Sequence, residues 1–377
     1  MAKNIVYLLA LFFLISCKKN NTEIKAVSDK GETIKTEFAT GFEVIEYENY
    51  NIIQLKKPWP NADRTFTYLL VDKNKEVPEN VSYDALVRTP VEKIVVTSTT
   101  HIPALESLGE IDKLVGFPNT KFISSVAARK RIDAGKVKEL GKNENINTEV
   151  LLDIQPDVVV GFAVNGNNKT FNTIKKAGIP VLYNAAWIEE HALGRAEWIK
   201  FFGYLFKKEA QANTVFNKIV EDYKSAKTLA KSTTNKPTVL AGSMFKDVWN
   251  VPYGNSWVAQ FIADANGDYL WKDTKGSGSI ALNIESVIEK AQHADIWVTS
   301  GNAMSKNELT ASNQHYKQFK AFQENNTYIA NRKGATGGLL FFELGPNRPD
   351  LILKDLIKIF HPELLPNHQL YFYTKIE

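Results

Sequence analysis

Two well-separated stretches of the chain, residues 147–162 and 283–301, follow one pattern. In each, an Asn-x-Glu triplet opens an amphipathic helical turn, an Asp precedes an apolar run of strand length, and a Gly follows where the strand should end. Each copy predicts a helix followed by a buried strand. The repetition therefore favours two similar α/β lobes, each presenting one glutamate, Glu149 and Glu285, at a matching place. Chance is the alternative, because the second copy carries two extra residues between Glu and Asp.

The amino terminus predicts export and lipidation. A lone Lys3 precedes an apolar run at 5–15 that is too short to span a bilayer, and Ser16-Cys17 follows. This pattern is typical of a bacterial lipoprotein signal peptide, residues 1–16, with cleavage ahead of a lipid-bearing Cys17. An ordinary secretory signal with an incidental cysteine is the alternative. Because Cys17 is the only cysteine in the chain, we expect a protein of the cell envelope that is held at a membrane by acyl chains and contains no disulfide.

Composition and motifs exclude several classes of function. The formal charge of +4 is small for 377 residues, and the densest basic cluster is only 129–131, so we expect no nucleic-acid partner. The six histidines show no metal-ligand spacing, so we expect no dedicated metal site. The chain has no nucleophile elbow, no Walker loop and no Cys-His pair, which leaves no candidate catalytic residue and favours a non-enzyme. An exported surface enzyme that uses scattered carboxylates is the rival class.

After the signal, the chain divides into five segments. We expect a flexible tether at 17–40, a β-rich extension at 41–89, a first α/β lobe at 90–190, connector helices at 191–235 and a second α/β lobe at 236–377. Short strand-like runs predict a small antiparallel sheet in the extension, packed on the first lobe. Alternating strands and helices predict a parallel sheet in each lobe.

A long helix is predicted between the lobes. Apolar residues recur mostly at three and four residues from 207 to 231, and neither Pro nor Gly interrupts this stretch. At about 1.5 Å per residue it would extend for about 36 Å, which suits a stiff connection. An ordinary surface helix within one lobe is the alternative.

Ligands of such sheets meet the loops at the carboxyl ends of the strands. The expected ligand-binding residues are therefore those that follow strand-like runs: Thr99, Thr100, His101, Asn119, Lys121, Phe162 and Trp187 in the first lobe, and Phe245, Trp249, Tyr253 and Asn302 in the second.

From Val91 to Pro366 the chain resembles the class III substrate-binding proteins of ABC importers, which bind iron-siderophores, cobalamin or haem. The matching motifs occur in the expected order at 93–98, 105–109, 114–116, 147–149 with 155–157, and 348–350 with 361–363. The resemblance implies two Rossmann-like lobes joined by a long connector helix. The β-rich extension is a departure from the minimal family fold.

The resemblance also implies a function and partners. It points to a lipid-anchored protein that delivers a ferric siderophore or a related metal chelate to an ABC permease dimer with its ATPase. Cobalamin or haem binding by the same fold is the alternative. Family members that bind haem commonly use a tyrosine or histidine ligand, and the loop at 117–124 has neither, although His101 could substitute. We expect no resident cofactor.

In this family each lobe offers one glutamate to arginines of the permease, and the matching positions are Glu149 and Glu285. Two carboxylates on separate lobes suit docking to a dimeric partner. The alternative is that both are simply helix-start glutamates favoured by the helix dipole.

Overall fold

The N-terminal lobe is built on a five-stranded parallel sheet. The computed structural model describes residues 31–166, 168–276, 278–335 and 337–377. The strand order in this lobe is β12-β11-β6-β7-β8. The bounds are β6 Ile94–Val96, β7 Leu114–Phe117, β8 Lys138–Glu139, β11 Val158–Gly161 and β12 Val181–Tyr183, with α1 Ile102–Ser107, α2 Val126–Asp133, α3 Thr148–Ile154 and α4 Lys169–Lys176 between them. The strands β6, β11 and β12 are fully buried runs, as expected for a sheet covered on both faces.

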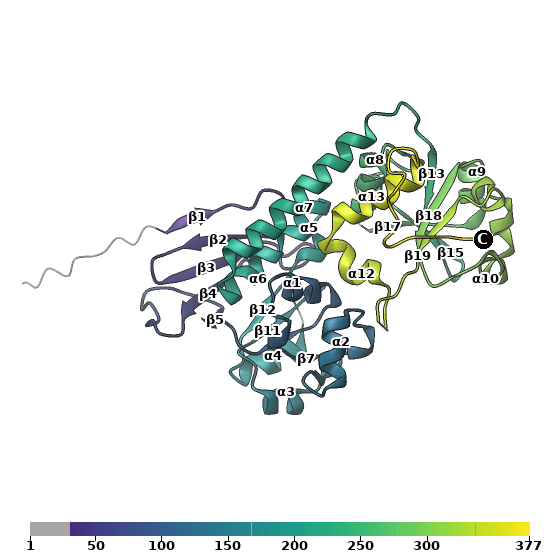
Figure 1. Ribbon diagram of the computed structural model, residues 1–377. Helices are drawn as coiled ribbons and strands as arrows, with labels where there is room; N and C mark the ends of the chain where they lie inside the picture. Colours follow the sequence, from purple (N-terminus) through teal and green to yellow (C-terminus); the bar gives the residue numbers. More distant parts are fainter. Residues whose placement is uncertain (1–30, 167, 277, 336) are drawn as a thin grey trace, which may run out of the picture. The chain divides into compact units, whose positions relative to one another are not determined.

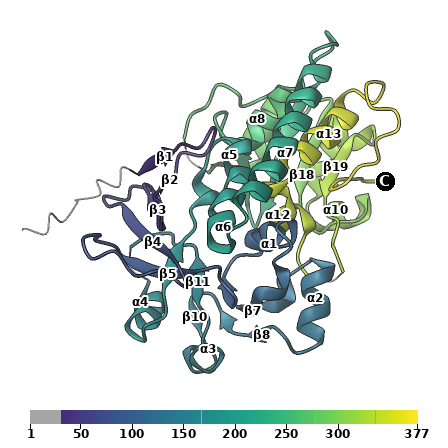
Figure 2. The ribbon, with the colours of Figure 1, turned by 60° about the vertical axis from the view of Figure 1, so that its left-hand side comes forward.

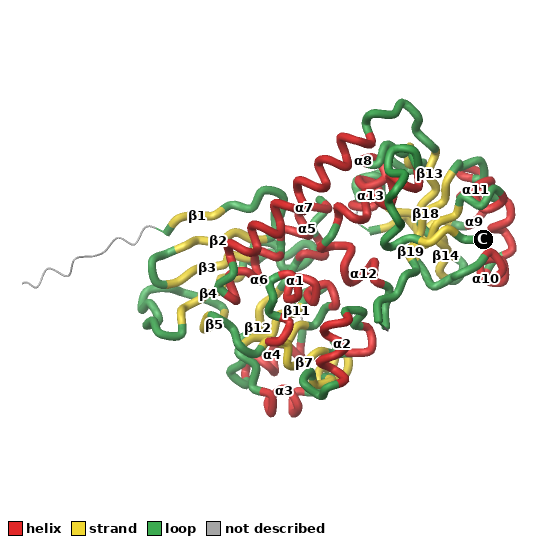
Figure 3. Tube along the Cα trace, in the orientation of Figure 1, coloured by secondary structure: helices red, strands yellow, loops and turns green. Residues whose placement is uncertain are grey.

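The C-terminal lobe repeats this plan. Its main sheet has the order β16-β13-β18-β19-β20, and all neighbours are parallel except β19 and β20. A three-stranded antiparallel sheet, β14-β15-β17, belongs to the same part of the chain (Figure 3). The bounds are β13 Thr238–Ala241, β14 Ser243–Phe245, β15 Val248–Pro252, β16 Asp268–Tyr269, β17 Ser279–Leu282, β18 Ile296–Ser300, β19 Thr327–Ala330 and β20 Thr374–Lys375, with α8 Trp257–Asp264, α9 Ile284–Ala291, α10 Lys306–Ser312, α11 Lys320–Gln323, α12 Leu340–Leu344 and α13 Pro349–Phe360.

The sequence repeat corresponds to a structural repeat. Asn147 caps α3, and its Oδ1 accepts a hydrogen bond from the backbone N–H of Val150 at 3.1 Å. Asn283 caps α9 in the same way, with Ser286 as the donor at 2.8 Å. Each capped helix precedes a strand that pairs in parallel with the first strand of its lobe, β11 with β6 and β18 with β13. The two copies therefore occupy matching places in two similar lobes, as predicted.

A long helix connects the lobes, as the apolar periodicity predicts. α5 (Ala192–Glu197) and α6 (Ile199–Phe206) lead into α7 (Glu209–Ala230), whose 22 residues give a length of about 33 Å. Its buried face includes Phe216, Ile219 and Tyr223. Figure 2 shows α7 between α6 and α13, and it packs against both of them. At its start, Gln211 Nε2 donates to the Ser107 carbonyl of the N-terminal lobe at 2.9 Å, so this helix contacts both lobes.

The extension forms its own sheet beside the N-terminal lobe (Figure 1). Its strands are β1 Glu32–Ile34, β2 Phe42–Glu46, β3 Tyr50–Leu55, β4 Phe66–Asp72 and β5 Ala85–Thr89. The first four strands are antiparallel, as predicted, whereas β5 pairs with β4 in parallel, which the sequence pattern did not indicate. The buried face of the sheet joins the core of the lobe, and the Tyr68 hydroxyl accepts a hydrogen bond from the backbone N–H of Tyr183 at 2.9 Å. The expected packing on the first lobe is therefore present.

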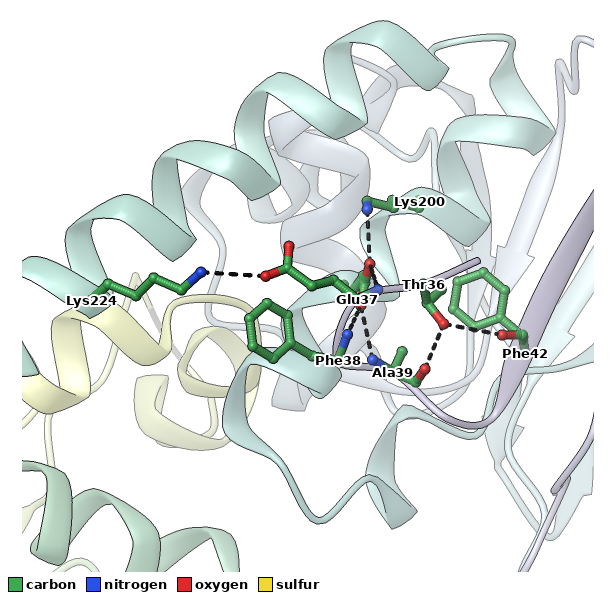
Figure 4. Close-up of polar contacts among 8 residues, drawn as sticks. Thr36, Glu37, Phe38, Ala39, Phe42, Lys200 and Lys224 are labelled. Carbon is green, nitrogen blue, oxygen red and sulfur yellow. Dashed lines mark hydrogen bonds and ion pairs between the residues drawn. The ribbon is translucent and has the colours of Figure 1, made fainter. Parts of the chain in front are cut away.

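Part of the predicted tether is fixed to the folded body. β1 lies within the segment that the sequence predicts to be flexible, and residues 36–41, here termed the strap, are held by two buried glutamates. Glu197 accepts hydrogen bonds from the backbone N–H groups of three strap residues, Glu37, Phe38 and Ala39, at 2.7–2.8 Å. Figure 4 shows the strap crossing close to α7, where Lys224 contacts Glu37. The prediction of flexibility to residue 40 is wrong for this stretch, because contacts with residues distant in the sequence hold it.

The remaining residues, 1–30, lie outside the described part of the chain. The predicted signal peptide and Cys17 fall there, so both stay predictions. Among residues 31–377, apart from 167, 277 and 336, no helix is long and apolar enough to cross a membrane.

Candidate functional site

A small cavity lies where loops at the carboxyl ends of N-terminal-lobe strands meet the C-terminal lobe. Its volume is about 50 Å³. The N-terminal lobe contributes loops after β6 and β12, the connector contributes α5 and α6, and the C-terminal lobe contributes the turn Gly345–Asn347. The lining residues are Thr100, His101, Ala104, Asn184, Ala186, Trp187, Arg195, Trp198, Phe202, Pro346 and Asn347. Because roughly 10–15 Å³ on this measure is enough to hold one water, the cavity has room for a small group of a few heavy atoms.

Among the described residues that line the cavity, Arg195 provides the only charge. Its Nε donates to the carbonyl oxygen of Glu189 at 2.9 Å, and its Nη2 donates to that of Trp187 at 2.8 Å. The guanidinium lies over the ring of Trp257, 4.5 Å from the ring centroid. Burial lowers the pKa of Arg195 to about 10, against an opposing effect of Glu189, so the side chain stays charged at neutral pH.

Two buried polar groups of the lining have no partner among the described residues. They are Nδ1 of His101 and Nδ2 of Asn184. The Asn184 Oδ1 accepts from the backbone N–H of Ala186 at 3.0 Å, which fixes the orientation of the amide. Burial lowers the pKa of His101 to about 3, so its ring is neutral at physiological pH. Buried polar atoms without partners are costly, and they mark places where a bound group completes the site.

The two lobes are joined at the carboxyl ends of β7 and β19 by a set of contacts termed the clasp. It consists of residues 122–125 on the N-terminal side and Gly334, Ala335, Gly337, Gly338 and Glu343 on the C-terminal side. The backbone N–H groups of Ser124 and Ser125 donate to the two carboxylate oxygens of Glu343 at 2.6 and 2.8 Å. The Ser124 hydroxyl donates to the Gly338 carbonyl at 2.6 Å, and its carbonyl accepts from Ala335 N–H at 3.1 Å.

Glycine permits the close approach of the two backbones in the clasp. A Cβ at Gly334 would lie 2.1 Å from the Ser124 carbonyl oxygen, and one at Gly337 would lie 2.4 Å from the carbonyl oxygen of Lys121. Gly337 also has a φ of +86°, which side chains rarely adopt. Burial raises the pKa of Glu343 to about 7; the two serine amides oppose this effect, and Glu106 adds to it.

Three of the predicted ligand-binding residues, Thr100, His101 and Trp187, meet at the cavity. Six others lie outside its lining and are exposed or partly exposed: Thr99, Asn119, Lys121, Phe162, Tyr253 and Asn302. Phe245, on β14, is 70% exposed and also lies outside the lining. Ligand binding by these residues stays a prediction.

Trp249 is placed differently from the prediction. The expectation that ligand-binding residues follow strand-like runs assigned Trp249 to the binding site. However, it lies within β15 and is fully buried. Its ring packs against Trp297, Tyr316 and Phe319, and its Nε1 donates to the Ala241 carbonyl at 3.2 Å. In this structure Trp249 is therefore a core residue, because these aromatic side chains cover its ring.

The sequence reasoning missed several residues of the site. Asn184 directly follows β12, so the strand-end rule could have found it. Arg195 lies on α5, and Asn347 lies in a turn of the C-terminal lobe, where it donates to the Thr100 carbonyl at 2.8 Å. Glu343 lies on α12. No local signal distinguishes these three residues, because their partners come from distant parts of the chain.

Glu149 and Glu285 occupy matching positions at the surface. Each is the second residue of its helix, α3 or α9, and each is exposed. In the part of the chain that the structure describes, neither carboxylate has a hydrogen bond or ion pair with another side chain. Both are therefore available to a partner.

Comparison with known proteins shows the family. The family model described as periplasmic binding protein matches residues 94–332. An uncharacterized lipoprotein of Methanocaldococcus jannaschii is 28% identical over 93% of this chain and 87% of that protein. A vitamin B12-binding protein of Vibrio parahaemolyticus is 22% identical over 65% of this chain and 83% of that protein.

A solved structure supports the same fold. The crystal structure of a possible iron-binding, periplasmic solute-binding protein from Staphylococcus epidermidis matches with a TM-score of 0.57 at 17% identity, covering 72% of this chain and 100% of that chain. The family model spans well over half of the chain, including α7 and the strands of both lobes except β20. The chain therefore belongs to the periplasmic binding protein family, whose members bind substrates and are not enzymes.

Proposed function

We propose that this protein is a lipid-anchored substrate-binding protein that delivers a ferric siderophore or a related metal chelate to an ABC import permease. Its family, the lobe architecture and the cavity at the strand ends support a binding role. The names of similar proteins, which mention iron and vitamin B12, support a metal chelate as the ligand. The Cys17 signal supports attachment to a membrane on its extracytoplasmic face.

The matched pair of exposed glutamates carries the proposal of a permease partner. Glu149 and Glu285 occupy the same position in the two structural repeats, and neither stabilises its own lobe through an ion pair in the described chain. A pair of arginine pockets on a dimeric permease would bind two such carboxylates with complementary charge. A helix-capping role alone does not require this match between lobes.

The test compares ligand affinity with uptake. The variants Glu149→Ala and Glu285→Ala should keep ligand affinity within about twofold, because neither residue lines the cavity, while uptake through the cognate permease and ATPase should fall at least about tenfold. Charge reversal to Lys should reduce uptake further, because repulsion between the lysine and the permease arginines adds to the loss of the ion pair. The two effects should be non-additive if both lobes dock as one unit.

The same helices supply matched controls. Asp153 and Glu289 are exposed carboxylates one helical turn beyond Glu149 and Glu285. Their Ala variants remove the same charge from the same helices and should leave uptake near the level of the unmodified protein. Full transport by the double Glu149→Ala, Glu285→Ala variant would reject docking through these glutamates.

A further inference from the structure

Arg195 is a half-buried cation without an acidic partner. Its described contacts are two backbone carbonyls and an aromatic face, and no carboxylate lies within ion-pair distance in the described chain. The carboxylate of nearby Glu189 is engaged elsewhere, since it accepts hydrogen bonds from Thr40, Gly41 and the Trp198 indole. A partly buried charge without a counter-ion is less favourable than one that an anion neutralises.

The surroundings of Arg195 favour an anion. In the part of the chain that the structure describes, the cavity lining contains one arginine and no aspartate or glutamate. Asn184 is 2% exposed, and its unpartnered Nδ2 is a hydrogen-bond donor. His101 is 3% exposed and neutral, so its unpartnered ring nitrogen can also donate in one tautomer. A guanidinium with an amide and an imidazole beside it suits the oxygens of a carboxylate.

We infer that this cavity binds a carboxylate group of the cargo, so that the protein selects anionic, carboxylate-bearing metal chelates over neutral ones. The inference rests on the proposed function and names the ligand class of the same site. The volume of about 50 Å³ suits one carboxylate arm, while the body of the chelate remains outside against partly exposed surfaces such as Trp187.

The test uses chelates that differ in charge. Tryptophan fluorescence of the full-length protein is titrated with ferric citrate and haem, which carry carboxylates, and with ferrichrome and cyanocobalamin, which are neutral. Trp187 and Trp198 line the cavity and supply the signal. We expect a carboxylate-bearing chelate to bind at least about tenfold more tightly than the neutral chelates, because a charge-assisted pair is lost with the latter.

Variants of Arg195 separate charge from packing. Arg195→Gln should weaken binding of the carboxylate-bearing chelate about ten- to hundredfold and change binding of the neutral chelates by less than about threefold. Arg195→Lys should retain part of the affinity, since it keeps the charge. Arg88→Gln is the matched control, because Arg88 is also half-buried and donates to two backbone carbonyls, those of Asp72 and Lys75, but belongs to the extension. It should leave all affinities unchanged.

A second variant tests the site independently of arginine removal. Asn184→Asp keeps the acceptor for Ala186 N–H and brings an internal carboxylate into the cavity. It should abolish binding of the carboxylate-bearing chelate while the thermal unfolding midpoint stays the same or rises. Undiminished binding of the carboxylate-bearing chelate by Asn184→Asp would contradict a carboxylate site in this cavity.

Other outcomes overturn the inference in distinguishable ways. Equal losses for charged and neutral chelates in Arg195→Gln would show a structural role for Arg195 and leave the proposed function standing. Exclusive binding of ferrichrome or cyanocobalamin would also reject carboxylate selection but keep the function. Binding of citrate without iron as tightly as ferric citrate would assign the cavity to a free anion. If none of the chelates binds, the proposed function fails together with the inference.

Discussion

Replacing Glu343 by glutamine should make the stability of the protein less sensitive to pH. Glu343 is 2% exposed, and its carboxylate oxygens accept the backbone N–H groups of Ser124 and Ser125 from the opposite lobe. Burial and the nearby charge of Glu106 disfavour the ionised form, despite the two amides. Glutamine has a similar shape but cannot ionise, so it removes the titration and keeps one acceptor for the clasp.

The magnitude follows from the shift in pKa. In the folded protein the pKa of Glu343 is raised from 4.5 to about 7, whereas the unfolded chain has the ordinary value. Between these pH values the folded protein keeps a proton that the unfolded chain has lost, so the free energy of unfolding falls as the pH rises. The difference of roughly 2.5 units corresponds to about 3 kcal/mol. This contribution is fully present below about pH 4.5 and is lost as the pH rises through about 7.

The assay is urea unfolding at constant ionic strength from pH 4.5 to pH 8, followed by tryptophan fluorescence. The free energy of unfolding of the unmodified protein, minus that of Glu343→Gln, should fall by about 3 kcal/mol across this range. Glu106→Gln should move this fall in the free energy of unfolding to lower pH, because it removes a negative charge that disfavours ionisation of Glu343. Glu289→Gln, an exposed control, should run parallel to the unmodified protein. Parallel curves for Glu343→Gln and the unmodified protein would refute the reasoning.

Two further predictions concern the amino-terminal part of the chain. Glu197→Gln should destabilise the protein by about 2 kcal/mol, since it removes the charged acceptor of three strap N–H groups, and residues 37–39 should lose protection in hydrogen exchange; unchanged protection would reject the strap contacts. Cys17→Ser should release the protein from membranes or leave it unprocessed. Unchanged membrane fractionation of this variant, with no palmitate label in the parent protein, would reject the proposed lipid anchor.

The predictions that succeeded depend on local signals. Residues close in sequence determine three of these signals: the helix caps at Asn147 and Asn283, the apolar runs of strand length, and the apolar periodicity of α7. They were sufficient to predict two α/β lobes and a connecting helix. The same local rule places Thr100, His101 and Trp187 at one cavity, because they follow strands whose carboxyl ends lie at the same edge of the sheet. Ligand binding by these residues stays a prediction.

The misses depend on contacts between distant residues. The strap continues a polar segment, and contacts with residues distant in the sequence hold it in place. These contacts are the hydrogen bonds to Glu189 and Glu197 and the packing of Phe38 and Ala39 against the core. Arg195 lies on a helix with no strand-end signal, and the absence of an acidic partner becomes visible only in three dimensions. Trp249 comes shortly after a strand-like run, which the sequence suggested was followed by a loop. The chain instead forms a hairpin there, and Trp249 lies within β15, which pairs with β14 and β17.

The strap has a consequence for how the family can diverge. Five successive strap residues, Glu37 to Gly41, are recognised through their backbone N–H groups, which nearly every amino acid provides. The two acceptors, Glu189 and Glu197, have no such substitute, because only a carboxylate offers several lone pairs at that reach. Mutations should therefore accumulate faster at the exposed strap residues Glu37 and Thr40 than at these two glutamates. Phe38 and Ala39 pack against the core, and a side chain at Gly41 would meet the ring of Trp198, so these three positions should vary less. Relatives should share the docking of this segment while differing at its exposed positions.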